Sequence, residues 1–393
     1  MALLATKTYF PALTSIRAIA AFLIFIHHCN PFYPGAHWAP KGIARTDTVV
    51  YLQHFVEQFH IGVSIFFVLS GLLITWRYEN RIEPTWRWAR AYFQNRFARI
   101  YPLYFLLTMV AIVCWWGNLV PGFDIAFGEP GYWSLKVKLV MTFLNLSLLR
   151  AFFTKYMFTG LAAGWSLTVE ECFYATAPLV LLAVRHHLKR IVFFPLFFLL
   201  LGVLVVVLVK LGTFPLLSRH GFVSSGKFML GWTFFGRATE FAIGMALAFY
   251  MKRQQARTIT GYWATGVGVV WILAALFMVT QAELPLFRTN EGLVTYAGIA
   301  TNNLFLPIGV AILFWGLINE RSKFRQLLET NVFQILGKSS YAFYLVHGGL
   351  LSILVGKYTN NILILFTVTQ TVAYLLWRFI EEPLHIRLRA NKL

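Results

Sequence analysis

The stretch RAIAAFLIFIHH, residues 17–28, decides the fold of this chain. Nine apolar residues separate its arginine from two histidines, and the whole stretch fits inside one membrane-spanning helix. An unpaired cation at the centre of a bilayer costs roughly 2.5–3.5 kcal/mol on insertion scales. Arg17 therefore requires a partner or a function.

Composition extends this interpretation to the whole length of 393 residues. Hydrophobic residues make up 58% and charged residues only 12%, whereas a soluble domain is about 25% charged. Apolar stretches of about 20 residues recur along the chain, each long enough to cross a bilayer as a helix. A transmembrane barrel would instead need strands of about 10 residues with alternating polarity. We predict an all-α, polytopic transmembrane helical bundle.

Ten membrane spans are predicted, at residues 13–29, 59–78, 97–116, 166–184, 191–211, 229–251, 262–281, 296–318, 333–355 and 362–380. The stretch 137–153 is apolar for only about ten residues between charges, which favours a re-entrant or interfacial helix. Counting it as a span would give eleven helices. Because the sequence has no repeat, low-complexity tract or flexible linker, residues 1–393 are predicted to form one integral membrane domain.

Charge predicts the orientation of these helices. The loops on the side of residue 7 hold most of the 34 Lys and Arg residues, and cytoplasmic loops carry such an excess. Both termini are therefore predicted to be cytoplasmic, in a plasma membrane. The same bias accounts for the net charge of +19, so no nucleic-acid partner is expected.

The N-terminal helix and the cysteines add two expectations. No small-residue cleavage pattern follows the first apolar stretch, so we expect a retained helix and not a signal peptide. Cys29, Cys114 and Cys172 lie in or beside apolar stretches without paired spacing. Neither a disulfide framework nor a metal site is predicted from them.

Helical geometry places Arg17 and His28 on one face of the first span. Eleven residues rotate a helix by three turns plus about 20° and rise about 16 Å, and His27 lies about 80° away from that face. Arg17 would bind an anion entering from the cytoplasm, while His28 would meet a molecule approaching from outside. The structural alternative is a snorkelling arginine with an interfacial histidine pair.

Two further spans carry ionisable groups in the middle or outer part of the bilayer. GWSLTVEECFY contains Glu170 and Glu171, and GRATEFAIG places Arg237, Glu240 and Gly244 on one helix face. Ionisable groups at this depth normally face a cavity and mark a substrate or proton path. For Arg237 and Glu240 the alternative is a structural ion pair, and Gly244 would allow close approach of a neighbouring helix.

Other polar positions complete the candidate site. GKSSYAFYLVH places Ser340, Tyr344 and His347 on one face. FHIGVSIFFVLSG brings Ser70 and Gly71 to mid-membrane depth, and we count both among the candidate binding residues.

RFARIYP, residues 96–102, places Arg96 and Arg99 at the cytoplasmic mouth of the third predicted span. A polyanion could dock there, although anchoring by the positive-inside bias is the structural alternative. The residues thus predict an anion site on the cytoplasmic side and a His/Glu site on the outer side.

Seven stretches together resemble the acyltransferase-3 family of integral membrane acyltransferases. They are LTSIRAIAAFLIFIHH, FFVLSGLLIT, RFARIYPLY, WSLTVEECFY, RATEFAIGMALA, SSYAFYLVH and the closing EEP, and they extend over residues 13–383. The resemblance implies transfer of an acyl group to hydroxyls of extracytoplasmic carbohydrate, with His28 as the catalytic residue and acyl-CoA as donor. Cys172 stands where many relatives have glutamine. Only about ten residues follow EEP, so we expect no appended SGNH-type domain.

This resemblance leads to a mechanism, with acetyl-CoA as a donor substrate and no tightly bound cofactor. Arg96, Arg99 and Arg17 would hold the CoA phosphates, and His28 would act as general base or as nucleophile through an acyl-imidazole. Glu170 or Glu171 would orient the imidazole.

Three further groups have provisional roles in the same mechanism. Arg237 or Tyr344 would stabilise the oxyanion, and His347 would hold the carbohydrate or glycolipid acceptor or relay its proton. Cys29 offers an acyl-cysteine alternative, but cysteine is common in apolar helices as a small hydrophobe.

Two functions of other classes stay open. A proton-coupled transporter would also use buried Arg, Glu and His groups, but it predicts internal repeats and broken paired helices. A membrane scaffold would have no use for such groups. Within the enzyme class, N-acetylation of an amino sugar and lipid acylation are alternatives, and residue types leave acyl chain length and oligomeric state open.

Overall fold

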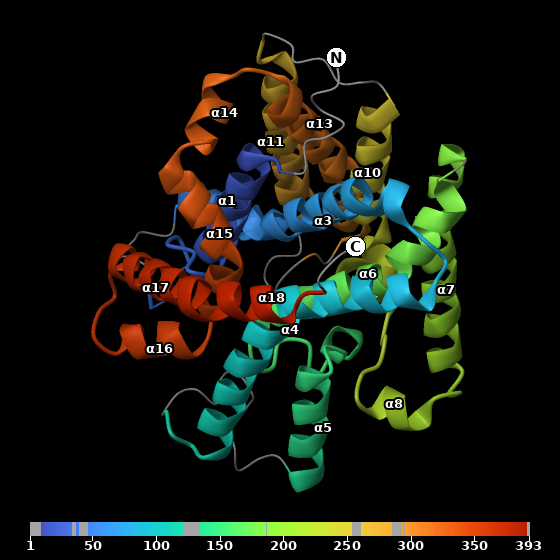
Figure 1. Ribbon diagram of the computed structural model, residues 1–393. Coiled ribbons are helices and arrows are strands. Elements are labelled where there is room, and N and C mark those ends of the chain that lie inside the picture. Colours follow the sequence, from blue (N-terminus) through green and yellow to red (C-terminus); the bar gives the residue numbers. More distant parts are fainter. Residues whose placement is uncertain are drawn as a thin grey trace. The chain divides into compact units, whose positions relative to one another are not determined.

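The computed structural model describes residues 9–33, 37–38, 46–120, 134–185, 187–253, 261–284, 293 and 295–390. These residues form helices and no strand, apart from one isolated bridge between Phe153 and Phe222, which confirms the all-α prediction (Figure 1). The helices are α1 Pro11–His28, α2 Asp47–Glu57, α3 Gly62–Tyr78, α4 Trp86–Trp116, α5 Leu135–Leu146, α6 Trp165–Val184, α7 Phe193–Lys210, α8 Pro215–Arg219, α9 Gly226–Trp232, α10 Phe234–Arg253, α11 Trp263–Glu283, α12 Tyr296–Ala300, α13 Leu306–Asn319, α14 Lys323–Leu328, α15 Asn331–Val346, α16 Leu350–Gly356, α17 Ile362–Leu376 and α18 Glu382–Leu388.

Eight helical stretches of the described residues are long and apolar enough to span a membrane, or nine if the bent pair α15 and α16 is one span. All but one of the predicted spans overlap these stretches. The exception, 229–251, corresponds to α10, a helix of 20 residues, which is less apolar because it contains Arg237 and Glu240. The chain is a multi-pass membrane protein, while a total of ten or eleven spans stays a prediction.

Two helices differ from their predicted form, and a third, α5, is as short as the sequence predicts. α4 begins at Trp86, where Thr85 caps its N-terminus, and not near residue 97. α5 has only 12 residues, about 18 Å, which is shorter than a bilayer core of about 30 Å. The predicted span 333–355 bends by 81° between α15 and α16, where Gly349 has a φ of 112° that other residues rarely adopt.

The chain folds into two compact units built from alternating segments. Unit 1 contains the described residues of Met1–Ile82, Ala177–Phe197 and Arg237–Ser340, and unit 2 those of Glu83–Thr176, Phe198–Gly236 and Tyr341–Leu393. The single domain over 1–393 stays a prediction.

Glycines set the helix spacing in unit 1. A Cβ at Gly62 of α3 would lie 2.3 Å from the Ala20 carbonyl oxygen of α1, and one at Gly244 of α10 would lie 2.0 Å from the Val68 carbonyl oxygen of α3. Such contacts let helix backbones approach closely within a membrane. The close neighbour predicted for Gly244 is therefore confirmed.

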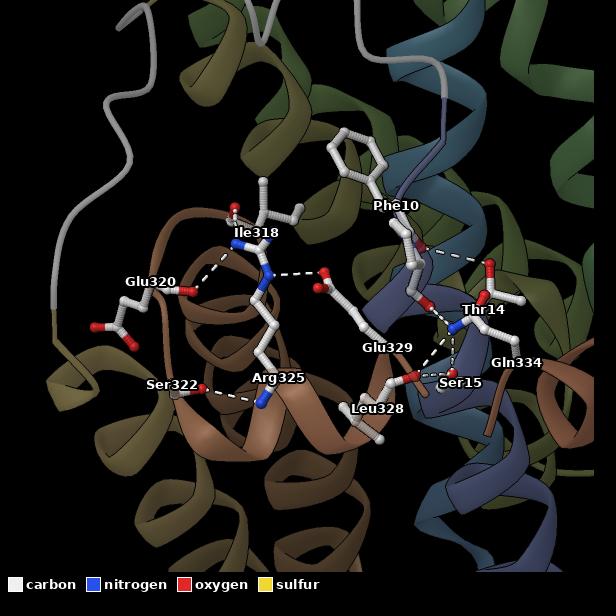
Figure 2. Close-up of polar contacts among 11 residues, drawn as sticks. Phe10, Thr14, Ser15, Ile318, Glu320, Ser322, Arg325, Leu328, Glu329 and Gln334 are labelled. Atoms are coloured by element: carbon white, nitrogen blue, oxygen red, sulfur yellow. Dashed lines mark hydrogen bonds and ion pairs between the residues drawn. The ribbon is translucent and has the colours of Figure 1, made fainter. Parts of the chain in front are cut away.

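Polar side chains join the start of α1 to α14 and α15 (Figure 2). Gln334 Nε2 donates to the Ser15 hydroxyl at 2.7 Å and to the Leu328 carbonyl at 2.9 Å, and Ser15 Oγ also donates to the Leu328 carbonyl. Nearby, Arg325 pairs with Glu329 at 2.8 Å. These bonds satisfy backbone carbonyls at a helix end, which would otherwise be unpaired, and they hold the helix that carries Arg17.

Unit 2 orders the segment before α6 around a buried arginine. Arg150 is fully buried and donates to the Asn145 side chain at 2.5 Å and to the carbonyls of Thr159 and Leu161. Burial lowers the pKa of this guanidinium. No carboxylate contributes to these bonds. Arg150 therefore fixes the chain before Trp165 through hydrogen bonds to an amide and to backbone carbonyls.

Candidate functional site

In unit 1, the C-terminal end of α1 presents two histidines together. His28 is the last residue of α1 and is exposed, and its ring hydrogen-bonds to the Ile24 backbone one turn earlier. The His27 and His28 ring centroids are 4.9 Å apart. The hydrogen bond to Ile24 orients the His28 ring from within its own helix. The predicted orientation of this ring by Glu170 or Glu171 is not needed for that and stays a prediction.

A third imidazole, which sequence analysis missed, joins this group. His60 lies in the turn Gln58–Ile61 before α3, with its ring centroid 5.8 Å from that of His27. His28 and Arg237 also lie within electrostatic range of His60. The stretch FHIGVSIFFVLSG contains this histidine, but sequence spacing alone gives no sign that it meets α1.

Arg237 and Glu240 form a buried ion pair on α10. Arg237 Nη2 donates to Glu240 Oε1 at 2.7 Å and its Nε donates to Oε2, and the side chains are 2% and 0% exposed. Arg237 Nη2 also donates to Ser64 Oγ at 3.1 Å, and its guanidinium lies 5.1 Å from the Phe67 ring centre. The structural ion pair considered from the sequence is therefore present.

The polar contacts of Arg237 continue toward α12. Ser64 Oγ donates to Asn302 Oδ1 at 3.5 Å, and Asn302 donates to Asn303 at 2.8 Å. Both asparagines are buried in the π-helical turn Thr301–Phe305. A π turn inside a helix often marks a functional position, and here Asn302 connects Ser64, the partner of Arg237, to Asn303.

The predicted anion residues of unit 1 lie on α1 and α3. Arg17 and Ser70 are half-buried. A Cβ at Gly71 would lie 2.2 Å from the Phe241 carbonyl oxygen, so helix packing alone requires glycine at this position. Donor-binding roles for Arg17, Ser70 and Gly71 stay predictions.

In unit 2, one arginine of α4 lies close to two glutamates and a tyrosine of α6. The Arg96 guanidinium lies 5.6 Å from the Tyr174 ring centre, and the Tyr174 hydroxyl donates to Glu170. Glu171 lies within electrostatic range of both Glu170 and Arg96. Sequence analysis did not predict Tyr174, although its i+4 spacing from Glu170 puts both on one helix face.

This grouping corrects the predicted depths. The sequence placed Arg96 at the mouth of a helix and Glu170 and Glu171 near the opposite side of the membrane. Because α4 begins at Trp86, Arg96 lies about 15 Å along the helix and shares a level with the two carboxylates. The two sites predicted for these residues are therefore one Arg/Glu group within unit 2.

Arg99 has a different environment from Arg96. It pairs with Glu381 at 2.8 Å, and the two side chains are 30% and 2% exposed. Glu381 is the first residue of the EEP stretch, so the pair explains one feature of that motif. A phosphate ligand would have to share Arg99 with a carboxylate.

His347 lies directly after α15, within unit 2. It is 1% exposed, and its Nδ1 donates to the Tyr344 carbonyl at 2.8 Å. The Tyr344 hydroxyl donates to the Ala163 carbonyl at 2.8 Å and lies 2.6 Å from Ser166 Oγ. Tyr344 therefore fastens α15 to the start of α6, and its predicted oxyanion role stays a prediction.

In the part of the chain that the structure describes, no group of three or more His, Cys, Asp or Glu side chains is arranged to hold a metal ion. Imidazole side chains such as His28 can take part in proton transfer or nucleophilic attack.

Comparison with known proteins shows that this chain is similar in sequence to acyltransferases. The sequence profile of a family described as "Acyltransferase domain" matches residues 10–380. The chain is 29% identical to Acyltransferase MdmB of Streptomyces mycarofaciens over 346 residues, which is 86% of this chain and 78% of MdmB. It is 28% identical to Putative peptidoglycan O-acetyltransferase YrhL of Bacillus subtilis and 23% identical to O-acetyltransferase OatA of Staphylococcus aureus, with 96% of this chain covered in both cases.

The chain spans little more than half of two of these relatives, 55% of YrhL and 57% of OatA. No solved structure matches the chain.

Proposed function

This chain belongs to the acyltransferase-3 family of integral membrane acyltransferases, and from that premise we propose that it moves an acetyl or other short acyl group from cytoplasmic acyl-CoA to a hydroxyl of a glycan outside the membrane. The names of OatA and YrhL, an O-acetyltransferase and a putative peptidoglycan O-acetyltransferase, support a carbohydrate acceptor. A bacterial inner membrane with both termini cytoplasmic fits this chemistry and the charge bias.

The observation that carries the proposal is the continuity of α1 from Pro11 to His28. One unbroken helix holds Arg17 and His28 on one face, about 16 Å apart. In the proposed function Arg17 binds a CoA phosphate, and the extended pantetheine arm carries the thioester along the helix to the imidazole. His28 is an exposed residue at the end of α1, where a substrate from outside could approach it.

The remaining groups have supporting roles in the proposed function. In unit 1, Arg237 stabilises the oxyanion that forms on the thioester oxygen, a contribution worth about 10²–10³ in rate for one donor in known enzymes. In unit 2, CoA binding by Arg96 and Arg99, beside Glu170, Glu171 and Glu381, and acceptor binding by His347 stay predictions.

The experiment that tests this function is CoA release by purified protein given acetyl-CoA and a panel of cell-envelope glycans. We expect His28→Ala to lower turnover at least 10²-fold, the usual contribution of a general acid–base group. Arg17→Ala should raise the KM for acetyl-CoA more than it lowers kcat.

An exposed histidine supplies the matched control. His187 lies in the loop between α6 and α7 and is exposed, so His187→Ala should behave as wild type. Release unaffected by His28→Ala would contradict the catalytic assignment. No release with any acyl-CoA would favour the transporter, which needs no thioester donor.

A further inference from the structure

The two ring nitrogens of His60 have different environments. Its Nδ1 lies 3.0 Å from the Glu57 backbone carbonyl oxygen. A carbonyl only accepts hydrogen bonds, so Nδ1 carries the proton and donates. The neutral ring therefore keeps its lone pair on Nε2.

That second nitrogen is buried and has no hydrogen-bond partner among the described residues. A buried polar atom without a partner costs about 1–3 kcal/mol, and native proteins retain few of them. The Glu57 bond explains the orientation of the ring but not the burial of Nε2. A substrate hydroxyl would supply the missing donor.

Other ionisable side chains lie near His60. Its ring is next to His27, which in turn contacts His28. Ser64, one turn further along the chain, accepts a hydrogen bond from Arg237, so a guanidinium lies on the same side. The close contact of Gly62 with Ala20 holds the start of α3 firmly against α1.

We propose that His60 is the general base that takes the proton of the acceptor hydroxyl, while His28 is the nucleophile that carries the acyl group. This inference rests on the proposed acyl transfer and divides its two steps between two imidazoles. Once Nε2 of His28 is acylated it can no longer take the acceptor proton, so the second step needs another base nearby.

The proposed transfer consists of two chemical steps and a final return of the proton. His28 Nε2 attacks the thioester carbonyl carbon, the C–S bond breaks and CoA leaves as a thiolate. The acceptor oxygen then attacks the acyl carbon, its proton passes to His60 Nε2 and the C–N bond to His28 breaks. The proton on His60 finally passes to water or to the CoA thiolate, which returns both rings to their starting state.

The test uses substitutions that separate the two nitrogens. The amide nitrogen in His60→Asn occupies the place of Nδ1 and keeps the donor to Glu57, but the variant has no base at Nε2. His60→Gln places a non-basic amide near Nε2, and His187→Asn is the exposed control. All are compared with wild type and His28→Ala as full-length purified protein.

We expect His60→Asn and His60→Gln to lose at least 10²-fold in turnover with a hydroxyl acceptor and to release about one CoA per protein in the first turnover. Hydroxylamine attacks acyl groups without a base, so it should restore CoA release and form the hydroxamate with both His60 variants. His28→Ala should form none above background.

Three results would overturn the proposal. Turnover of His60→Asn within about threefold of wild type would show that Nε2 takes no proton. If the His60 variants lose the first CoA release as well as turnover, His60 acts in the first step or has only a structural role. Failure of hydroxylamine to restore CoA release would lead to the same conclusion. Absence of CoA release by wild-type protein would refute the proposed function itself, a result distinct from these.

Discussion

Glu240 accepts hydrogen bonds from both Nε and Nη2 of Arg237, three residues earlier on α10, and the two side chains are almost completely buried. Removing one partner of a buried ion pair leaves an uncompensated charge, at a cost of about 3–5 kcal/mol. We therefore expect Glu240→Gln to lower the free energy of unfolding by that amount, measured by denaturant unfolding in detergent.

The double variant Arg237→Gln/Glu240→Gln is the control for this pair. It removes both charges together, so it should lose much less stability than the sum of the two single variants. Additive losses would show that the two side chains contribute independently and would contradict a coupled pair.

Gly244 determines the approach of α10 to α3. We expect Gly244→Ala to lower the melting temperature and the yield of monodisperse protein, because the new Cβ would lie 2.0 Å from the Val68 carbonyl oxygen and the helices would have to separate. Gly266→Ala is the matched control on α11, where a Cβ meets nothing within 4 Å, and alanine there should stabilise the helix by up to about 1 kcal/mol. Equal behaviour of the two variants would contradict the packing argument.

Glu320 caps the N-terminus of α11. Its carboxylate accepts from the Ala264 and Thr265 backbone amides at 2.7 and 2.9 Å and from the Thr265 hydroxyl at 2.6 Å, and it is fully buried. Glu320→Ala should cost about 1–3 kcal/mol and speed hydrogen exchange of both amides. The neighbouring pair of Glu329 with Arg325 (Figure 2) is partly exposed, so Glu329→Ala should cost less than about 1 kcal/mol.

The predicted orientation can be tested by thiol labelling in intact cells. In a variant with the three native cysteines replaced, His187→Cys and Tyr358→Cys introduce thiols at exposed positions. We expect a membrane-impermeant maleimide to label position 358 and to reach position 187 only after cell lysis. The reverse pattern would place both termini outside.

The sequence by itself determined whatever depends on one helix. Apolar length predicts membrane helices because the bilayer core has a known thickness, and helical periodicity predicts that Arg237 and Glu240 meet and that Gly244 contacts a neighbour. The end of α4 follows from hydropathy, but its start does not, because the amphipathic residues from Trp86 onward continue the helix without an apolar signal.

Only the tertiary structure decided which helices meet. In a membrane, the lipid-facing and protein-facing sides of a helix are both apolar, so the pattern of hydrophobic residues does not identify partners. Three contacts join segments that are separate in the sequence. They are the contact of His60 with His27, the pair of Arg99 with Glu381, and the group of Arg96, Tyr174 and Glu170. In unit 1, the contact of His60 with His27 also requires close approach of α3 to α1, which at Gly62 is set by the absence of a single Cβ atom.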